Sequence, residues 1–404
     1  MTITQIKMIE ITDGIHQYLH SELMKLMIPF KPVLTLLIAC VMCHSVTEAK
    51  PDALRPQLQF INASDEKIEI LWLSEGGKEV SNGTVNPGKN RVITTTLGHK
   101  FAVIGQKSKT RVQVECIARV QGFRFAPNEK DGVPAFYTQR VVTGGFPIVA
   151  SATVNPYALK EAAYLVDQLL MKRNDVRKAM VDSGARLCII AYNEYTTDLP
   201  EFAWFSEGKS RYPGVSAKDF WDARARGTGG SVTDPYCTCG EENLLGYPGD
   251  PYAEENILIH EFAHNIHLRG MTNIDPTFDT RLQKAYKKSM AAGLWKNKYA
   301  ATNRFEYFAE GVQSWFGNNR ENDHDHNHVN TRKELIEYDP ALAAFCREVF
   351  RDTKLTYTKP STRLTGHMKG YDPSNAPAFK WPARLNKAKA AIRKANKAAD
   401  QPKK

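Results

Sequence analysis

The stretch that decides the fold is HEFAH, which runs from His260 to His264. On a helix it places two imidazoles one turn apart on the same face, with the carboxylate of Glu261 between them, as a helix-borne zinc site requires. Apolar residues recur at helical spacing over residues 257–266, so the pattern predicts a helix through the motif. The alternative is a buried amphipathic helix that carries two incidental histidines. We favour the zinc site and therefore expect a metallohydrolase.

The expected helix begins at Asp250 and Pro251, because aspartate caps a helix N-terminus and proline fits the first helical position. Gly270 is its expected end. These bounds place the motif in the middle of the helix, where the geometry of metal ligands is rigid.

A second helix is expected after Tyr299, because Phe305 and Phe308 recur on one side of it. A catalytic zinc needs a third protein ligand and an open position for water. Glu306 and Glu310 share one face of this helix, and two carboxylates four residues apart repel each other mildly. A cation beside them would reverse that repulsion, so this helix is a candidate source of the third ligand.

The HEFAH motif and the Y-x6-E-x3-E segment that begins at Tyr299 together resemble the C-terminal protease domain of anthrax lethal factor and its relatives, a family of gluzincin type. The resemblance implies that His260, His264 and Glu306 bind one Zn²⁺. It also implies that Glu261 is the general base and that Tyr299 assists the oxyanion. The implied fold is a mixed α+β, zincin-like metallopeptidase domain.

This ligand set predicts the reaction. Zinc held by two neutral imidazoles and a carboxylate acidifies a water, which Glu261 deprotonates and delivers to a peptide carbonyl. Tyr299 then donates a hydrogen bond to the developing oxyanion. Glu310 is either an acceptor for the N–H of a ligand histidine or an unspecialised helix carboxylate. The expected function is a zinc metalloendopeptidase acting on protein or peptide substrates; the alternative is a catalytically idle zinc domain in a cell-surface binding protein.

Four of the histidines that follow the motif lie within the next 64 residues. His267 lies near the same helix face but too far along the axis to share a metal with His260, so we expect it outside the ligand set or exposed. His324, His326 and His328 alternate within a polar stretch that has no apolar period, which predicts a loop. A second metal site in that loop is the alternative.

Three segments before the motif bear on the cleft. A helix is expected from Ala158 to Met180, followed by a short buried strand over residues 186–192. If this strand lies at the sheet edge beside the zinc helix, a peptide could add to it as a further strand; otherwise it is only core. The loop over residues 227–233, rich in glycine, threonine and serine, could line the cleft or simply connect.

The N-terminal third is expected to be a separate all-β module. Its strand patterns alternate and are separated by turn residues, as in a half-buried antiparallel sheet. This segment resembles the β domain of the von Hippel-Lindau family, which implies a small antiparallel β-sandwich with a pocket that includes Trp72, Thr95 and His99. Asn82 and Phe101 replace a tyrosine and a tryptophan of that pocket, so we expect a docking role rather than tight hydroxyproline binding.

The expected organisation has five parts and the α+β fold class. The parts are a leader over residues 1–49, the β-sandwich over 50–125, a linker over 126–144, the metallopeptidase domain over 145–379, and a basic tail over 380–404 that is disordered or a frayed helix. Residues 145–338 also resemble a group of bacterial and fungal secreted proteins with this peptidase-like domain.

The leader predicts export to the cell envelope, the periplasm or the medium. Lysines precede an apolar run over residues 33–43, and small residues follow at a cleavage site that ends at Ala49. Acidic residues among the first 23 are unusual for a signal peptide, so Met24 or Met27 is an alternative start of the chain. The LIAC sequence ending at Cys40 also looks like a bacterial lipobox, which predicts a lipid anchor, although the apolar run continues past it and favours soluble secretion. No later segment is apolar for long enough to span a membrane.

Five cysteines follow the leader, and an odd number in an oxidising compartment leaves at least one unpaired. Cys237 and Cys239 are too close in sequence to bridge each other. We therefore expect one disulfide from that pair to another cysteine.

The net charge is concentrated at the end of the chain. Residues 380–404 carry a net charge of +8 out of a total of +10, so the remainder is nearly neutral. A nucleic-acid-binding protein would carry a basic face on its folded domain. We therefore expect no nucleic-acid partner.

Overall fold

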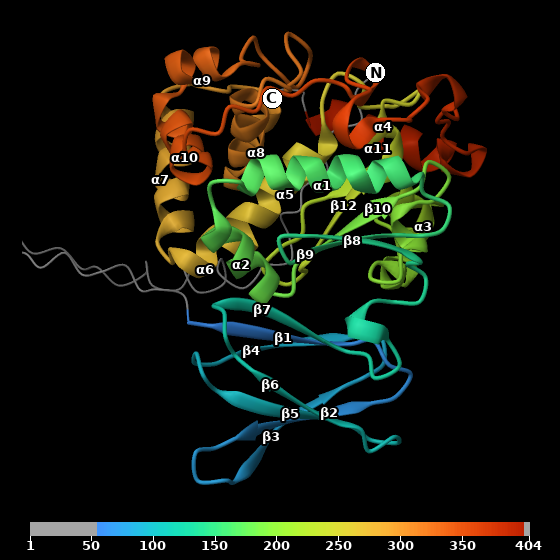
Figure 1. The fold of residues 1–404 in the computed structure, drawn as a ribbon, viewed down its shortest axis with the longest axis vertical. Helices are drawn as coiled ribbons and strands as arrows, with labels where there is room; N and C mark the ends of the chain where they lie inside the picture. The colour runs from blue at the N-terminus through green and yellow to red at the C-terminus, as the bar shows by residue number, and fades with distance from the viewer. Residues whose placement is uncertain (1–54, 400–404) are drawn as a thin grey trace, which may run out of the picture. The chain divides into compact units, whose positions relative to one another are not determined.

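The structure, a computed structural model, describes residues 55–399 (Figure 1). The predicted leader, including Cys40, lies outside the described residues. Strands dominate the first part of the described chain and helices accompany a further sheet in the rest, so the predicted α+β class is confirmed. No helix in this part of the chain is long and apolar enough to cross a membrane.

The first strands form two sheets packed as a β-sandwich, with the strand orders β4-β1-β7 and β3-β2-β5-β6. The strands are β1 (Gln57–Asn62), β2 (Ile68–Leu73), β3 (Glu79–Val85), β4 (Asn90–Thr94), β5 (Lys100–Gly105), β6 (Arg111–Glu115) and β7 (Val120–Phe125). Side chains from both sheets, including Phe60, Ile70 and Phe101, meet in a shared core. Neighbouring strands pair antiparallel except β1 and β7, which run parallel.

The structure corrects the predicted linker over residues 126–144. Its last residues form β8 (Gln139–Thr143), which pairs antiparallel with β9 (Phe146–Ala150). Gly144 and Gly145 make the tight turn between them, with φ angles of +54° and +86° that disfavour other residues. The sheet of the second domain therefore begins with β8, and the Gly-Gly pair is the hairpin signal that the linker prediction missed.

The second domain is built on a five-stranded sheet with the order β11-β12-β10-β9-β8. Its other strands are β10 (Arg186–Ile190), β11 (Gly227–Thr228) and β12 (Tyr236–Gly240). β10 lies between β9 and β12, and all its residues are buried, so it is not the edge strand to which a peptide could add. Its mostly apolar run is typical of a strand covered on both faces. The edge strands are β11 and β8, and β11 is the one that lies against α5.

Helices accompany this sheet in the second domain. They are α1 (Pro156–Leu170), α2 (Asn174–Asp182), α3 (Ala217–Arg224), α4 (Glu241–Leu245), α5 (Ile257–Asn265), α6 (Thr272–Ile274), α7 (Phe278–Ala291), α8 (Arg304–Trp315), α9 (Arg332–Tyr338), α10 (Pro340–Phe350) and α11 (Asn386–Ala399). α1 packs across β8 and β9, and α5 packs against β12 (Figure 1). Their apolar side chains and one face of the sheet form the main core.

The single helix predicted from Ala158 to Met180 is in fact two helices, α1 and α2. Arg173 leaves the helical conformation between them, with φ −138° and ψ 60°. Its guanidinium group donates to the carbonyl oxygens of Glu348 and Val349 at 3.0 and 3.1 Å. These long-range hydrogen bonds, which no local pattern encodes, stabilise the break.

The basic tail also differs from its prediction. α11 packs on α3, and Leu385, Ala388 and Ile392 are buried. These three residues recur at helical spacing and give the segment an apolar face. Arg384 adds an ion pair with Asp219 at 2.7 Å. The segment is therefore a helix that docks on α3 through these three residues.

The predicted disulfide is wrong. All five cysteines of the described chain are free and buried. Cys237 and Cys239 lie among apolar side chains of the main core, whereas Cys188 belongs to the cluster on the other face of the sheet. Burial raises the pKa of the Cys237 and Cys239 thiols well above the ordinary value, which keeps both in the unreactive protonated form.

Candidate metal centre

Two neighbouring helices, α5 and α8, bring the three predicted ligands together. His260 and His264 stand one turn apart on α5, and Glu306 lies in the first turn of α8. Oε2 of Glu306 is 3.0 Å from Nε2 of His260 and 3.3 Å from Nε2 of His264. The three ligand atoms fall within 4.8 Å of one another, so one metal ion can reach them all. Within residues 55–399 this is the one triad with such geometry.

α5 begins later than predicted. Its N-cap is Asn256, whose side chain accepts from the N–H of Ile259 at 3.0 Å. Asp250 instead accepts from the N–H of Tyr252 at 2.9 Å and closes a turn. At its other end, α5 passes into a π-helical turn over Ile266–Met271, beyond the predicted end at residue 270. Wide turns of this kind occur frequently at functional sites.

Asn303 fixes the start of α8. Its Oδ1 accepts from the N–H groups of Phe305 and Glu306 at 2.8 and 3.0 Å. An asparagine N-cap sets the first helical turn, and the helix dipole favours a negative charge there. The local sequence therefore determines where the Glu306 carboxylate leaves the helix.

The electrostatics of the triad suit a cation. Burial lowers the pKa of His260, but the hydrogen bond and the charge of Glu306 outweigh burial and raise that pKa to about 10. Burial raises the pKa of Glu306, but the two histidines outweigh it, so the carboxylate stays ionised. A field that holds a proton between these side chains also favours a divalent ion, which would replace the proton.

Gln313 orients the first histidine. Its Oε1 lies 2.8 Å from Nδ1 of His260, and its Nε2 donates to Glu255 at 3.0 Å. Oε1 of Glu310, the predicted partner, is 3.6 Å from the same Nδ1, and Glu310 accepts from Asn319 at 3.0 Å. A hydrogen bond at Nδ1 leaves Nε2 available for a metal. Gln313 was not predicted as a site residue, although its position seven residues after Glu306 places it on the same helix face.

Glu261 is half-buried beside the triad. Burial raises the pKa of its carboxyl group, as a general base that works near neutral pH requires. Gly227 of the edge strand β11 comes so close that a Cβ there would lie 2.9 Å from Cγ of Glu261. The edge strand therefore runs directly past the candidate base.

Tyr299 lies in a short turn before α8. Its ring stacks on that of His260, with centroids 6.0 Å and planes 24° apart. Its N–H donates to the carbonyl oxygen of Asp325 at 2.8 Å, which fixes the backbone. Burial and the charge of Glu306 raise the pKa of Tyr299 well above its ordinary value. The positive charge of Arg224, a residue not predicted as part of the site, offsets part of this rise. The hydroxyl is therefore a hydrogen-bond donor at neutral pH.

The glycine-rich loop over residues 227–233 lines the centre. A Cβ at Gly229 would overlap the side chain of His264, so this position accepts only glycine. The side chain of Asn265 donates to the carbonyl oxygens of Gly229 and Pro235 at 3.4 and 3.1 Å and ties the loop to α5. Of the two interpretations of this loop, the lining role fits the structure.

Two other histidines are buried close to the centre. His267 is fully buried, not exposed, and its Nε2 lies 3.0 Å from Asp279. His326 is also buried, with Nδ1 2.8 Å from Asp323 and Nε2 3.3 Å from Glu310. In the part of the chain that the structure describes, these side chains form no second metal-binding triad.

The predicted pocket residues of the sandwich also lie together. The rings of Trp72 and His99 are 5.3 Å apart, and Oγ1 of Thr95 is 3.0 Å from Nδ1 of His99. The side chain of Asn82 donates within its own strand, and Phe101 is buried in the sandwich core. Trp72, Thr95 and His99 therefore form a cluster. Neither Asn82 nor Phe101 adds a polar group to it.

Comparison with known proteins assigns no family. No family model matches the chain, and no curated protein matches it. The triad is compatible with a bound metal ion on the geometry of its own side chains.

Proposed function

We propose that the protein is an exported zinc metalloendopeptidase. The observation that carries the proposal is the convergence of His260, His264 and Glu306 on one point, with Glu261 beside them. Two imidazoles and one carboxylate are the ligands of catalytic zinc sites that keep a position open for water. The resemblance of the two motifs to the lethal-factor family supports the same assignment.

The side chains around the triad have separate roles. Glu261 takes a proton from the attacking water and passes it to the leaving amine, a cycle that its raised pKa favours. Tyr299 stays protonated and donates to the oxyanion. When bound, zinc lowers the pKa of its water and polarises the substrate carbonyl.

The edge strand supports a peptide as the substrate. β11 pairs with β12 on one side only, so its other side can accept an extended peptide as a further strand. Because Gly227 of β11 lies against Glu261, a peptide added there would pass the base. This role belongs to β11 and not to β10, which is central.

The alternative is a catalytically idle zinc domain in a cell-surface protein that binds partners through its sandwich. The cluster of Trp72, Thr95 and His99 fits a docking surface of that kind. A domain that had lost catalysis would be expected to lose its base or a ligand. Both Glu261 and Tyr299 are present beside the triad, which favours the enzyme.

Profiling cleavage of a peptide library by mass spectrometry tests the proposal. The full chain should cut a subset of peptides, a chelator should stop the cleavage, and added zinc should restore it. Zinc-loaded protein that cuts no peptide would favour the idle domain. Cleavage that the chelator leaves unchanged would contradict the metal mechanism.

The Tyr299→Phe variant tests the oxyanion donor. We expect turnover to fall about 100- to 1,000-fold with little change in substrate binding, because the lost hydrogen bond acts in the transition state. Tyr164→Phe, which removes a hydroxyl from α1, is the matched control and should keep full turnover. Wild-type turnover in Tyr299→Phe would remove Tyr299 from the mechanism.

The Gln313→Leu variant tests which residue orients His260. We expect zinc affinity to fall about 10- to 100-fold, as for other hydrogen-bond partners of metal ligands. Glu310→Gln should have the smaller effect, because Glu310 lies 3.6 Å from Nδ1 of His260 whereas Gln313 lies 2.8 Å away. Competition with a chromophoric chelator measures both affinities, and the reverse order would assign the role to Glu310.

A further inference from the structure

A second set of charged side chains lies at the far end of α8. A cavity of about 460 Å³ is lined there by residues of α8, α9 and α10 and by the two residues that follow α10. These residues, which we call the arginine pocket, are Trp315, Arg332, Ile336, Arg347, Arg351 and Asp352. Trp315 follows Glu306 by nine residues on α8, which places the pocket about 14 Å along the helix from the triad.

The positive charge of the arginine pocket is not neutralised. Among the described residues, no ion pair joins Arg332, Arg347 or Arg351 to an acid, and Arg332 donates only to backbone carbonyl oxygens. Asp352, the one acidic side chain in the lining, lies 3.8 Å from Lys172. Three guanidinium groups therefore share one depression without a partner charge.

Two of these guanidinium groups lie against the same indole. Arg332 is 4.3 Å and Arg347 5.8 Å from the centre of the Trp315 ring. Burial and the nearby charge of Arg347 lower the pKa of Arg332. Like charges held this close oppose each other, and a bound anion would relieve the repulsion.

The backbone of Arg351 gives a second, independent indication. Its φ of 54° with ψ of −134° lies in a region that favours glycine. An arginine in this conformation is strained, and such strain occurs preferentially at functional sites. Its side chain lines the same cavity as the other two arginines.

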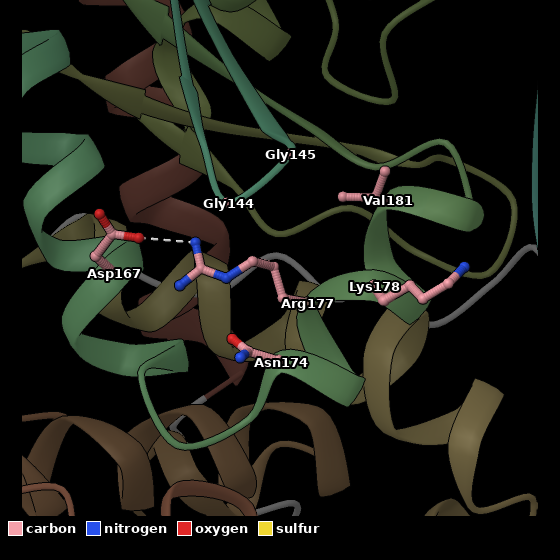
Figure 2. A pocket seen from close by; sticks show the side chains of 7 residues that line it. All are labelled: Gly144, Gly145, Asp167, Asn174, Arg177, Lys178 and Val181. Carbon is pink, nitrogen blue, oxygen red and sulfur yellow. Dashed lines mark hydrogen bonds and ion pairs between the residues drawn. The ribbon is translucent and has the colours of Figure 1, made fainter.

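A second cavity in the same domain shows the contrast (Figure 2). This cavity, of about 410 Å³, is lined in part by Arg177 and Lys178. Arg177 donates to Asp167 at 2.8 Å, and Lys178 pairs with Asp182 at 2.5 Å. The positive charges of Arg177 and Lys178 are therefore neutralised within the protein, whereas those of the arginine pocket are not.

We propose that the arginine pocket is a binding site for a tetrahedral oxyanion, a phosphate or sulfate group, outside the metal centre. A tetrahedral dianion accepts hydrogen bonds from several guanidinium groups at once, whereas one carboxylate neutralises only one of them. The exposed side of Ile336 offers an apolar surface for the molecule that carries the group.

Calorimetric titration of the full chain tests the proposal with inorganic phosphate, inorganic sulfate, a phosphoserine peptide and the same peptide without phosphate. We expect the oxyanions and the phosphoserine peptide to bind, and the unmodified peptide not to bind. Tighter binding of the phosphoserine peptide than of inorganic phosphate would identify a peptide side chain as the source; equal binding would identify the free ion.

Two variants locate the binding. Arg347→Gln should weaken phosphate binding about tenfold, the loss of one charged hydrogen-bond partner. Arg351→Gly should weaken it similarly and also raise the melting temperature, because glycine relieves the backbone strain. The double variant Lys333→Gln/Lys354→Gln removes two exposed charges near the pocket and should bind phosphate as the wild type does. Absence of binding, or equal weakening in the lysine control, would overturn the proposal, whatever the peptidase activity.

Discussion

We expect the Glu261→Gln protein to keep its zinc and its fold but to lose peptidase turnover by about 100- to 10,000-fold. Glutamine has nearly the same size and fits the same half-buried position, but its amide cannot accept a proton at neutral pH. The ligand atoms of the triad all come from His260, His264 and Glu306, so the substitution leaves the metal site complete. The loss should therefore appear in turnover and not in zinc content.

Zinc content by mass spectrometry, circular dichroism and peptide turnover together check this prediction. Glu254→Gln is the matched control, because Glu254 is an exposed glutamate before the same helix, and it should keep full turnover. If Glu261→Gln retained more than about a tenth of wild-type turnover, Glu261 could not be the base.

The His264→Ala protein should lose stoichiometric zinc. With only two of the three ligands left, the site binds zinc weakly. Removing a residue that only hydrogen-bonds to a metal ligand typically lowers metal affinity by up to roughly 100-fold, so losing a ligand itself should lower zinc affinity by more. His264 is buried beside Gly229, and alanine fits the space that histidine leaves, so the fold should survive. Peptidase activity should fall with the zinc.

Zinc content after dialysis against a buffered low zinc concentration measures this loss. His328→Ala is the control, because His328 belongs to the loop and not to the triad, and it should retain one zinc per chain. One full equivalent of zinc in the His264→Ala protein would place the metal elsewhere.

Local periodicity accounts for the parts of the fold that the sequence predicts. The alternating strands of the sandwich and the helical spacing around His260 depend on neighbouring residues, and both appear in the structure. The missed features depend on distant residues. Arg173 breaks a helix by bonding to Glu348 and Val349, and the strand order that makes β11 the edge follows from packing. The prediction for the basic tail rested on its net charge and overlooked the apolar spacing of its helix.

The candidate site likewise has features that the local sequence predicts and features that depend on the tertiary fold. The motif spacing predicts the histidine pair, since two histidines one turn apart must share a helix face, whereas Glu306 as the third ligand is what the family resemblance implies. Gln313 and Arg224 act on the centre through contacts and charges that arise only when helices and loops pack together. The close approach of Gly229 to His264 is likewise a product of the tertiary fold, because a glycine in a loop carries no local sign of the side chain it will meet.

Titrating zinc into chelator-treated full chain while following peptide hydrolysis tests the central claim most directly. The claim is that one zinc, held by His260, His264 and Glu306, drives the reaction. Hydrolysis should start from zero, rise in proportion to added zinc and saturate at one equivalent. Hydrolysis that needs no zinc, or that continues to rise well beyond one equivalent, would contradict the account.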